Sequence, residues 1–200
     1  MPITLRTGLP GHGKTLFALQ EVEDLRRQTG RPVYYHGIPE LTLPWTPIDE
    51  PDKWFELEEG AIIVIDEAQT VFRPRGSGAQ VPEKVAKFET HRHRGHDVHL
   101  ITQHPNLIDA NIRRLVDTHV HVFRGWGLSS TTRYEWQECQ NPQSRSARHD
   151  CTMKTSRRFP REVYGWYKSA TLHTVQPRLP WKLICFVVFC LAGMGYLGHR

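Results

Sequence analysis

The first part of the chain alternates between short apolar runs and amphipathic stretches. Residues 3–7 have the character of a short strand, and residues 14–28 follow a Gly/Pro turn with Leu and Val at helical spacing. Residues 32–36 resemble a second strand, and the continuous apolar run at 61–66 is typical of a buried parallel strand. The pattern predicts strand, loop, helix and strand, with 61–66 at the centre of a sheet.

Further elements are predicted by the same signals. They are one helical turn around Trp54 in a Pro-rich, acidic connection at 38–60, a helix at 82–94 closed by Gly95, a strand at 98–102 ending in Gln103, a helix at 107–116, and a hairpin of strands 119–123 and 131–137. The polar, basic stretch at 140–158 is interpreted as a loop or linker. Helices between successive strands predict an α/β fold with a mainly parallel sheet that helices cover on both faces.

Residues 183–198 contain no charged residue in 16 positions. A helix of that length spans about 24 Å, against a hydrocarbon core of about 30 Å, so the segment is a short candidate for a transmembrane helix, with a soluble core helix as the alternative. Trp181 and Tyr196 lie where interfacial aromatic residues belong, and Lys182 can reach the headgroups. The expected division is an α/β domain at 1–175, a juxtamembrane linker at 176–182 and one membrane helix at 183–198.

Positive charges near the apolar segment are unevenly placed. Only Arg200 follows it, whereas several Lys and Arg residues precede it: Arg161, Lys168, Arg178 and Lys182. By the positive-inside rule, this bias predicts a single-pass protein whose amino-terminal domain lies in the cytoplasm. The amino end carries no apolar signal region, which agrees with a domain that stays in the cytosol.

The composition limits the class of protein but does not identify a binding partner. Two hundred residues suit one domain with an appendage, and a formal charge of +5 suits either a polyanionic partner or an ordinary soluble surface. Four scattered cysteines do not form a disulfide framework, so reduced thiols are expected. Cys139, His149 and Cys151 match no zinc spacing and lack a fourth ligand.

A phosphate-binding motif lies between the first strand and the first helix. Gly8, Gly13, Lys14 and Thr15 fit G-x-x-x-x-G-K-T, and a plain glycine-rich turn is the alternative. Backbone N–H groups and the helix N-terminus would bind the phosphates, Lys14 would reach the β- and γ-phosphates, and Thr15 would ligate Mg²⁺. The expected ATP-binding positions are Gly8, Leu9, Pro10, Gly11, His12, Gly13, Lys14, Thr15 and Leu16, of which His12 is given no chemistry of its own.

Two acidic residues and one amide follow buried strands at the edge where an open α/β sheet binds its ligand. Asp66 is expected to hold Mg²⁺ and Glu67 to orient the attacking water, although a helix cap with an acidic first turn is the alternative. Gln103 ends the next strand and is a candidate sensor of the γ-phosphate; the alternative is an amide that simply caps the next turn.

Several basic residues are candidates for roles between subunits. An arginine finger supplied by a neighbouring subunit is expected from one of Arg92, Arg94, Arg113 and Arg114, although solvated arginines are the usual case. Arg73 and Arg75 lie in a Gly-containing loop and either contact a polyanionic load or are solvated. A metal site is the less favoured interpretation of His91, His93, His96, His99 and His104, because these residues span several elements.

Taken with the membrane segment, these motifs resemble the zonula occludens toxin (Zot) family, which includes the gene I assembly proteins of filamentous phages. The resemblance rests on the P-loop at 8–15, the Val-Ile-Asp-Glu-Ala-Gln sequence at 64–69, the His-Arg-His-Arg-Gly sequence at 91–95 with Asp97, the Thr-Gln pair at 102–103, residues 112–116, and residues 167–170 with 173–174. It covers nearly the whole chain.

The resemblance implies an inner-membrane ATPase that exports filamentous virions, with phage single-stranded DNA and coat protein as partners. By the same analogy the active form is a homo-oligomeric ring, a hexamer, and longer relatives also meet an outer-membrane exit channel. The alternatives are a Zot-type toxin or binding module, a plasmid or conjugative DNA pump, a nucleotide-binding scaffold without turnover, and a small-molecule kinase. Glu67 beside Asp66 argues against the kinase.

Overall fold

A computed structural model describes residues 1–76, 78–125 and 130–168. Its centre is an eight-stranded sheet in the order β3-β2-β4-β5-β1-β6-β7-β8, in which the pairs from β3 to β6 are parallel and the last two are antiparallel. The strands are β1 (Ile3–Thr7), β2 (Val33–His36), β3 (Thr46–Pro47), β4 (Ile62–Ile65), β5 (Asp97–Ile101), β6 (Thr118–Phe123), β7 (Ser130–Trp136) and β8 (Met153–Arg158). The mainly parallel α/β fold is confirmed.

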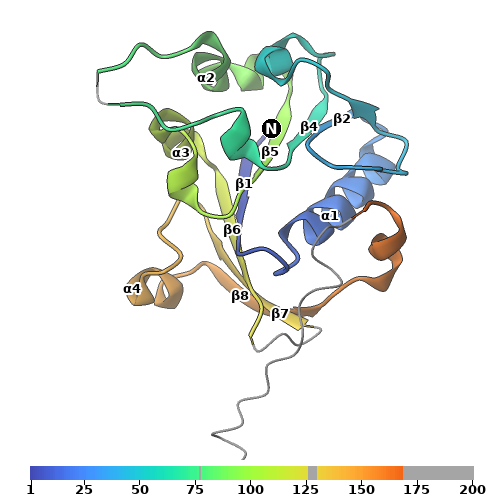
Figure 1. Ribbon diagram of the computed structural model, residues 1–200, viewed down its shortest axis with the longest axis vertical. Coiled ribbons are helices and arrows are strands. Elements are labelled where there is room, and N and C mark those ends of the chain that lie inside the picture. Colours follow the sequence, from blue (N-terminus) through green and yellow to red (C-terminus); the bar gives the residue numbers. More distant parts are fainter. Residues whose placement is uncertain (77, 126–129, 169–200) are drawn as a thin grey trace, which may run out of the picture.

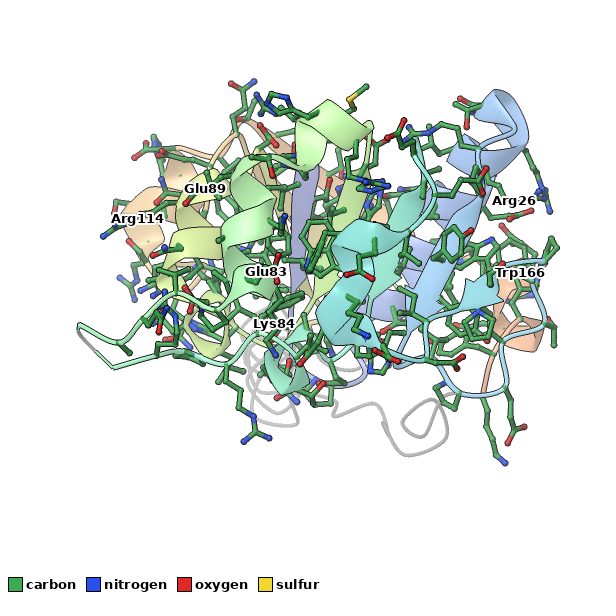
Figure 2. The ribbon with its side chains drawn as sticks, turned by 90° about the horizontal axis from the view of Figure 1, so that it is seen from above. Arg26, Glu83, Lys84, Glu89, Arg114 and Trp166 are labelled. Atoms are coloured by element: carbon green, nitrogen blue, oxygen red, sulfur yellow. The ribbon has the colours of Figure 1, made fainter. Side chains whose placement is uncertain are left out.

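Helices lie on both faces of this sheet (Figure 1). They are α1 (Lys14–Thr29), α2 (Glu83–Ala86), α3 (Ala110–Leu115) and α4 (Arg145–His149), with short 3₁₀ turns η1 (Pro51–Glu56), η2 (Ala68–Thr70), η3 (Lys87–Glu89), η4 (His91–Arg94), η5 (Pro105–Leu107) and η6 (Arg161–Gly165). Seen from above, Arg114 of α3 lies on one side of the molecule and Arg26 of α1 and Trp166 on the other, with Glu83 of α2 nearer the middle (Figure 2). The fold therefore has three layers.

The alternation of side chains in β4 accounts for the two helical layers. Ile63 and Ile65 belong to a core with residues of α2, η3 and α3, whereas Ile62 and Val64 belong to a core with residues of α1. Successive residues of a strand point to opposite faces, so a continuous apolar strand is stable only when both faces are covered. This explains why 61–66 has no polar position before Asp66.

Residues 140–158 were expected to be a loop or linker, and that prediction is wrong. They contain α4 and the edge strand β8, which pairs with β7 from Met153 opposite Glu135 to Arg158 opposite Ser130. The strand lacks an apolar alternation, because its side chains meet charged and aromatic partners instead of a hydrophobic core. Arg157 Nη1 donates to Glu21 of α1 at 2.9 Å, and Lys154 Nζ lies 5.5 Å from the centre of the Tyr134 ring.

Two other predicted elements differ in detail. The helix expected at 82–94 is divided into α2, η3 and η4, although Gly95 does close it in a left-handed conformation. The helix expected at 107–116 is confined to α3, preceded by η5. Within the described ranges no helix has the length and apolar character needed to cross a bilayer, and the predicted membrane segment at 183–198 lies outside those ranges.

Candidate active site: a P-loop with an acidic partner strand

The loop between β1 and α1 has the form of a phosphate cradle. Gly11 and Gly13 have φ angles of 75° and 92°, and α1 begins directly after them at Lys14. Its first turn carries no acidic residue and no side chain caps its amino end, so the partial positive charge of the helix end faces the loop. This arrangement suits the phosphates of a nucleotide.

Gly13 is required by space as well as by conformation. A Cβ atom built on it would lie 2.6 Å from Cε1 of Phe159, which packs against the loop. A left-handed φ and a contact of that length together exclude a larger residue. The cradle is therefore shaped in part by a residue that follows the last strand of the sheet.

The hydroxyl and carboxylate expected to hold Mg²⁺ meet directly. Thr15 Oγ1 donates to Asp66 Oδ2 at 2.7 Å, and the backbone N–H of Glu67 donates to Asp66 Oδ1 at 2.8 Å. Burial raises the pKa of Asp66 to about 6, while the Thr15 hydrogen bond and the charge of Lys14 oppose that rise. A hard cation prefers such oxygen ligands, and its charge would favour the ionised carboxylate, so this pair fits Mg²⁺.

Glu67 is held in a strained position beside this pair. Its backbone is left-handed, with φ 48° and ψ 46°, which is uncommon for a residue other than glycine and costs conformational energy. Gln69 Nε2 donates to its carboxylate, and Gln69 Oε1 accepts from Thr102 Oγ1 at 2.7 Å. The end of β5 thus orients the Glu67 side chain through Gln69.

Gly37, which directly follows β2, lets its own stretch of backbone pass close to Asp66. A Cβ atom on Gly37 would lie 2.5 Å from the carbonyl oxygen of Asp66, and the φ angle of Gly37 is 81°. The carbonyl oxygen of His36, the last residue of β2, accepts from the backbone N–H of Asp66 at 2.9 Å. The carboxyl ends of β2, β4 and β5 therefore meet at the acidic pair.

Gln103 lies beside the P-loop, as expected from its position at the end of β5. Strand β5 separates β4 from β1, and the backbone N–H of Gly8 donates to the carbonyl oxygen of Gln103 at 3.2 Å. This bond joins the residues that follow β5 to the start of the cradle through the main chain. Sensing of the γ-phosphate by its side chain stays a prediction.

The four candidate finger arginines do not reach the cradle of their own chain. Arg92 pairs with Asp117, and Arg94 Nη2 donates to the Leu57 carbonyl at 3.1 Å. Both lie before the amino end of β5, at the sheet edge opposite the P-loop. The other two are on α3, where Arg113 Nη1 donates to Asn106 Oδ1 at 2.6 Å and Arg114 is exposed.

Two other groups of basic residues are placed by the structure. Arg75 Nε lies 2.5 Å from Oδ2 of Asp109, which is 1% exposed, whereas the side chain of Arg73 is exposed to solvent. The five histidines of the 91–104 region are dispersed over η4, the connection that follows it, β5 and the residues after β5. Across the part of the chain that is described, no three His, Cys, Asp or Glu side chains are grouped to hold a metal ion.

The cradle opens into a pocket of about 270 Å³, and part of its wall was missed at the level of sequence. Its lining includes Gly37, Pro39, Phe159, Tyr167 and Lys168 in addition to the P-loop and the acidic pair. A glycine directly after a strand was an available signal for Gly37. The last three follow a segment without apolar periodicity, and nothing local indicates that they return to the P-loop.

Arg124 is a further residue that the sequence did not single out. It follows β6, the strand beside β1, and its Nη1 donates to the carbonyl oxygen of Gly11 at 3.2 Å. Its guanidinium also lies 5.0 Å from the centre of the Phe159 ring. Arg124 thus joins the P-loop to the pocket wall.

Residues 38–174 match the family described as Zonular occludens toxin (Zot). A relative, the putative assembly protein ORF301 of Pseudomonas phage Pf3, is 36% identical over 206 residues, covering 99% of this chain and 68% of the relative. This chain belongs to the Zot family. The resemblance that the motifs indicated is confirmed.

Solved structures agree with this placement in the Zot family. The N-terminal domain of zonular occludens toxin from Neisseria meningitidis superposes with a TM-score of 0.72 at 30% identity, covering 84% of this chain and 99% of that one. The DNA-packaging ATPase B204 of Sulfolobus Turreted Icosahedral Virus has a TM-score of 0.53 at 12% identity, covering 78% and 97%, and shows the shared fold alone. With its P-loop and its Asp66–Glu67 pair, this Zot-family chain is a P-loop ATP hydrolase.

Proposed function

We propose that the chain is a motor ATPase that drives the assembly and extrusion of filamentous phage through the bacterial inner membrane. The observation that carries the proposal is the direct contact of Thr15 with Asp66 beside Glu67, in a chain similar to a phage assembly protein. A P-loop whose acidic strand ends in Asp-Glu is suited to hydrolysis by an oriented water. Phage single-stranded DNA and coat protein are the loads that we propose.

The residues of the site divide the chemistry among them. Lys14 and the loop backbone bind the phosphates, and Thr15 with Asp66 holds Mg²⁺, which when bound neutralises charge on the transferred phosphoryl group. Glu67, oriented through Gln69, positions and polarises the attacking water. Gln103, fixed to the P-loop by its backbone, reports the presence of the γ-phosphate.

The proposed active form is a ring in which neighbouring subunits share each nucleotide. The four candidate arginines lie outside the pocket of their own chain, so any one that acts as a finger acts on a neighbour. We further propose that residues 183–198 anchor the subunits in the inner membrane with the ATPase domain in the cytoplasm. Confinement to a plane raises the effective concentration of the subunits and favours a ring.

A hydrolysis assay on the full chain in lipid tests the proposal. ATP turnover is measured with and without phage single-stranded DNA or coat protein, and the Lys14→Ala variant serves as the inactive control. Stimulation by either load, absent in the control, is the expected result. Turnover that neither load changes would exclude a motor for them, and binding without turnover would favour a scaffold.

Mixing of variants tests the shared site. A Lys14→Ala chain is combined with a chain in which one candidate arginine is replaced by Ala, and partial recovery of turnover is expected for the true finger. An interface in the mixed ring can then pair an intact cradle with an intact finger. The absence of recovery for all four arginines, together with monomeric protein in lipid, would rule out the shared-site ring.

A further inference from the structure

The lining of the nucleotide pocket carries groups of two kinds. The P-loop backbone, Lys14, Thr15 and the acidic pair together suit phosphates and a cation. The lining also includes Phe159, Tyr167 and Lys168, which all belong to the segment after β8. Trp166 of this segment lies on the same side of the molecule as Arg26 of α1 (Figure 2).

Phe159 is fixed against the P-loop. Phe159 is 9% exposed, and its ring packs on the ring of Phe17 in α1 with 5.8 Å between the centroids. The guanidinium of Arg124 lies 5.0 Å from the centre of the same ring, and a Cβ on Gly13 would collide with it. An aromatic ring held in this way is a rigid surface that costs little entropy to present to a ligand.

The segment around Tyr167 is fixed to the loop after β2. The carbonyl oxygen of Trp166 accepts from the backbone N–H of Thr42 at 2.8 Å, and the backbone N–H of Lys168 donates to the Pro39 carbonyl at 3.2 Å. Lys168 Nζ also pairs with Glu40 at 2.7 Å. Val163, in the preceding turn, is fully buried against the α1 core. This wall is therefore part of the fold and not a loose tail.

We propose that Phe159 and Tyr167 form the nucleoside subsite of the pocket and bind the base and ribose of the triphosphate. This inference rests on the proposed function, since the phosphates must occupy the P-loop. The base is the flat, weakly polar part of the ligand, and aromatic side chains bind bases by stacking. The P-loop and the acidic pair supply charge but no aromatic ring, so the two halves of the ligand match the two kinds of group in the lining.

A consequence is that a base bound in the subsite stabilises the segment that ends at residue 168. The hydrogen bonds of Thr42 and Lys168 hold this wall in place, so a nucleotide that packs against it slows the exchange of both amide hydrogens. A ligand with phosphates alone leaves their exchange unchanged. Residue 168 directly precedes the stretch that contains the proposed membrane anchor.

The test compares a ligand that has a base with one that lacks it. Calorimetry on the full chain in detergent, with Mg²⁺, measures the Kd of a non-hydrolysable ATP analogue and that of inorganic tripolyphosphate. Tyr167→Ala should weaken the analogue about tenfold, the scale of one lost base stack, and leave tripolyphosphate unchanged. Tyr167→Phe, which keeps the ring, should bind both ligands nearly as the wild type does.

Tyr164→Ala is the matched control, because Tyr164 lies in the turn η6 just before Tyr167 but is 37% exposed and is not part of the pocket lining. It should change neither Kd. An unchanged Kd for the analogue in Tyr167→Ala, or an equal loss for both ligands, would overturn the subsite. If the wild type bound neither ligand, or if Lys14→Ala bound both normally, the proposed function itself would fail and the subsite with it.

Discussion

Glu23 lies in the middle of α1, and its carboxylate is 1% exposed. Four N–H groups donate to it: Arg26 Nε at 2.8 Å and Nη2 at 2.9 Å, Arg27 Nε at 2.8 Å, and Trp45 Nε1 at 2.9 Å. Trp45 ends the stretch that begins at Gly37, so this carboxylate fixes one wall of the nucleotide pocket to the P-loop helix. We predict that Glu23→Gln destabilises the fold through loss of charge.

The magnitude follows from the pKa of Glu23. The Arg26 hydrogen bond, with those from Trp45 and Arg27, lowers this pKa from 4.5 to about 2 against the opposing effect of burial. A shift of that size corresponds to about 3 kcal/mol of unfolding free energy at pH 7. Because the pKa is lower in the folded state, this stability is complete above pH 4.5 and is lost as the pH falls toward 2.

Urea denaturation of wild type and Glu23→Gln at pH 7 and pH 3.5 measures this contribution. The gap between the two proteins should be about 3 kcal/mol at pH 7 and about 2 kcal/mol at pH 3.5, since only the wild type titrates. Glu162→Gln is the control, because Glu162 is exposed and accepts a hydrogen bond from the neutral side chain of Gln20. It should change stability by less than about 0.5 kcal/mol. A gap for Glu23→Gln that is the same at both pH values would refute a charge-based contribution.

Three further predictions concern the site and its surroundings. Burial lowers the pKa of His119 to about 3, so this group should remove about 2 kcal/mol from the unfolding free energy of the wild type between pH 7.5 and pH 5. In urea denaturation, the unfolding free energy of His119→Gln should therefore depend less on pH over this range. Gly37→Ala should weaken nucleotide binding in calorimetry because its Cβ meets Asp66, whereas Gly30→Ala, also left-handed but with no atom within 4 Å, should not; equal affinities would contradict the steric argument. Glu67→Gln should bind nucleotide with wild-type affinity but stop phosphate release, and unchanged turnover would remove Glu67 from the role of base.

The sequence was sufficient for the features that depend on local chemistry. The P-loop needs glycines, Lys14 and Thr15 at fixed spacing between a strand and a helix, so a short motif predicts both the conformation and the ligand class. The acidic pair could also be predicted from the sequence, because a continuous apolar run indicates a buried parallel strand and such strands end at the ligand edge. Its contact with Thr15 confirms that placement.

Only the tertiary structure decided the order of the strands and the origin of the pocket wall. β5 lies between β1 and β4, and this order depends on long-range pairing that no local pattern encodes. β8 is held to the sheet by contacts such as that of Arg157 with Glu21, whose sequence separation is 136 residues. The return of Phe159 to Gly13 follows from that strand. Specific ion pairs and aromatic contacts between distant residues leave no periodic trace in the sequence, so folding alone brings this wall to the P-loop.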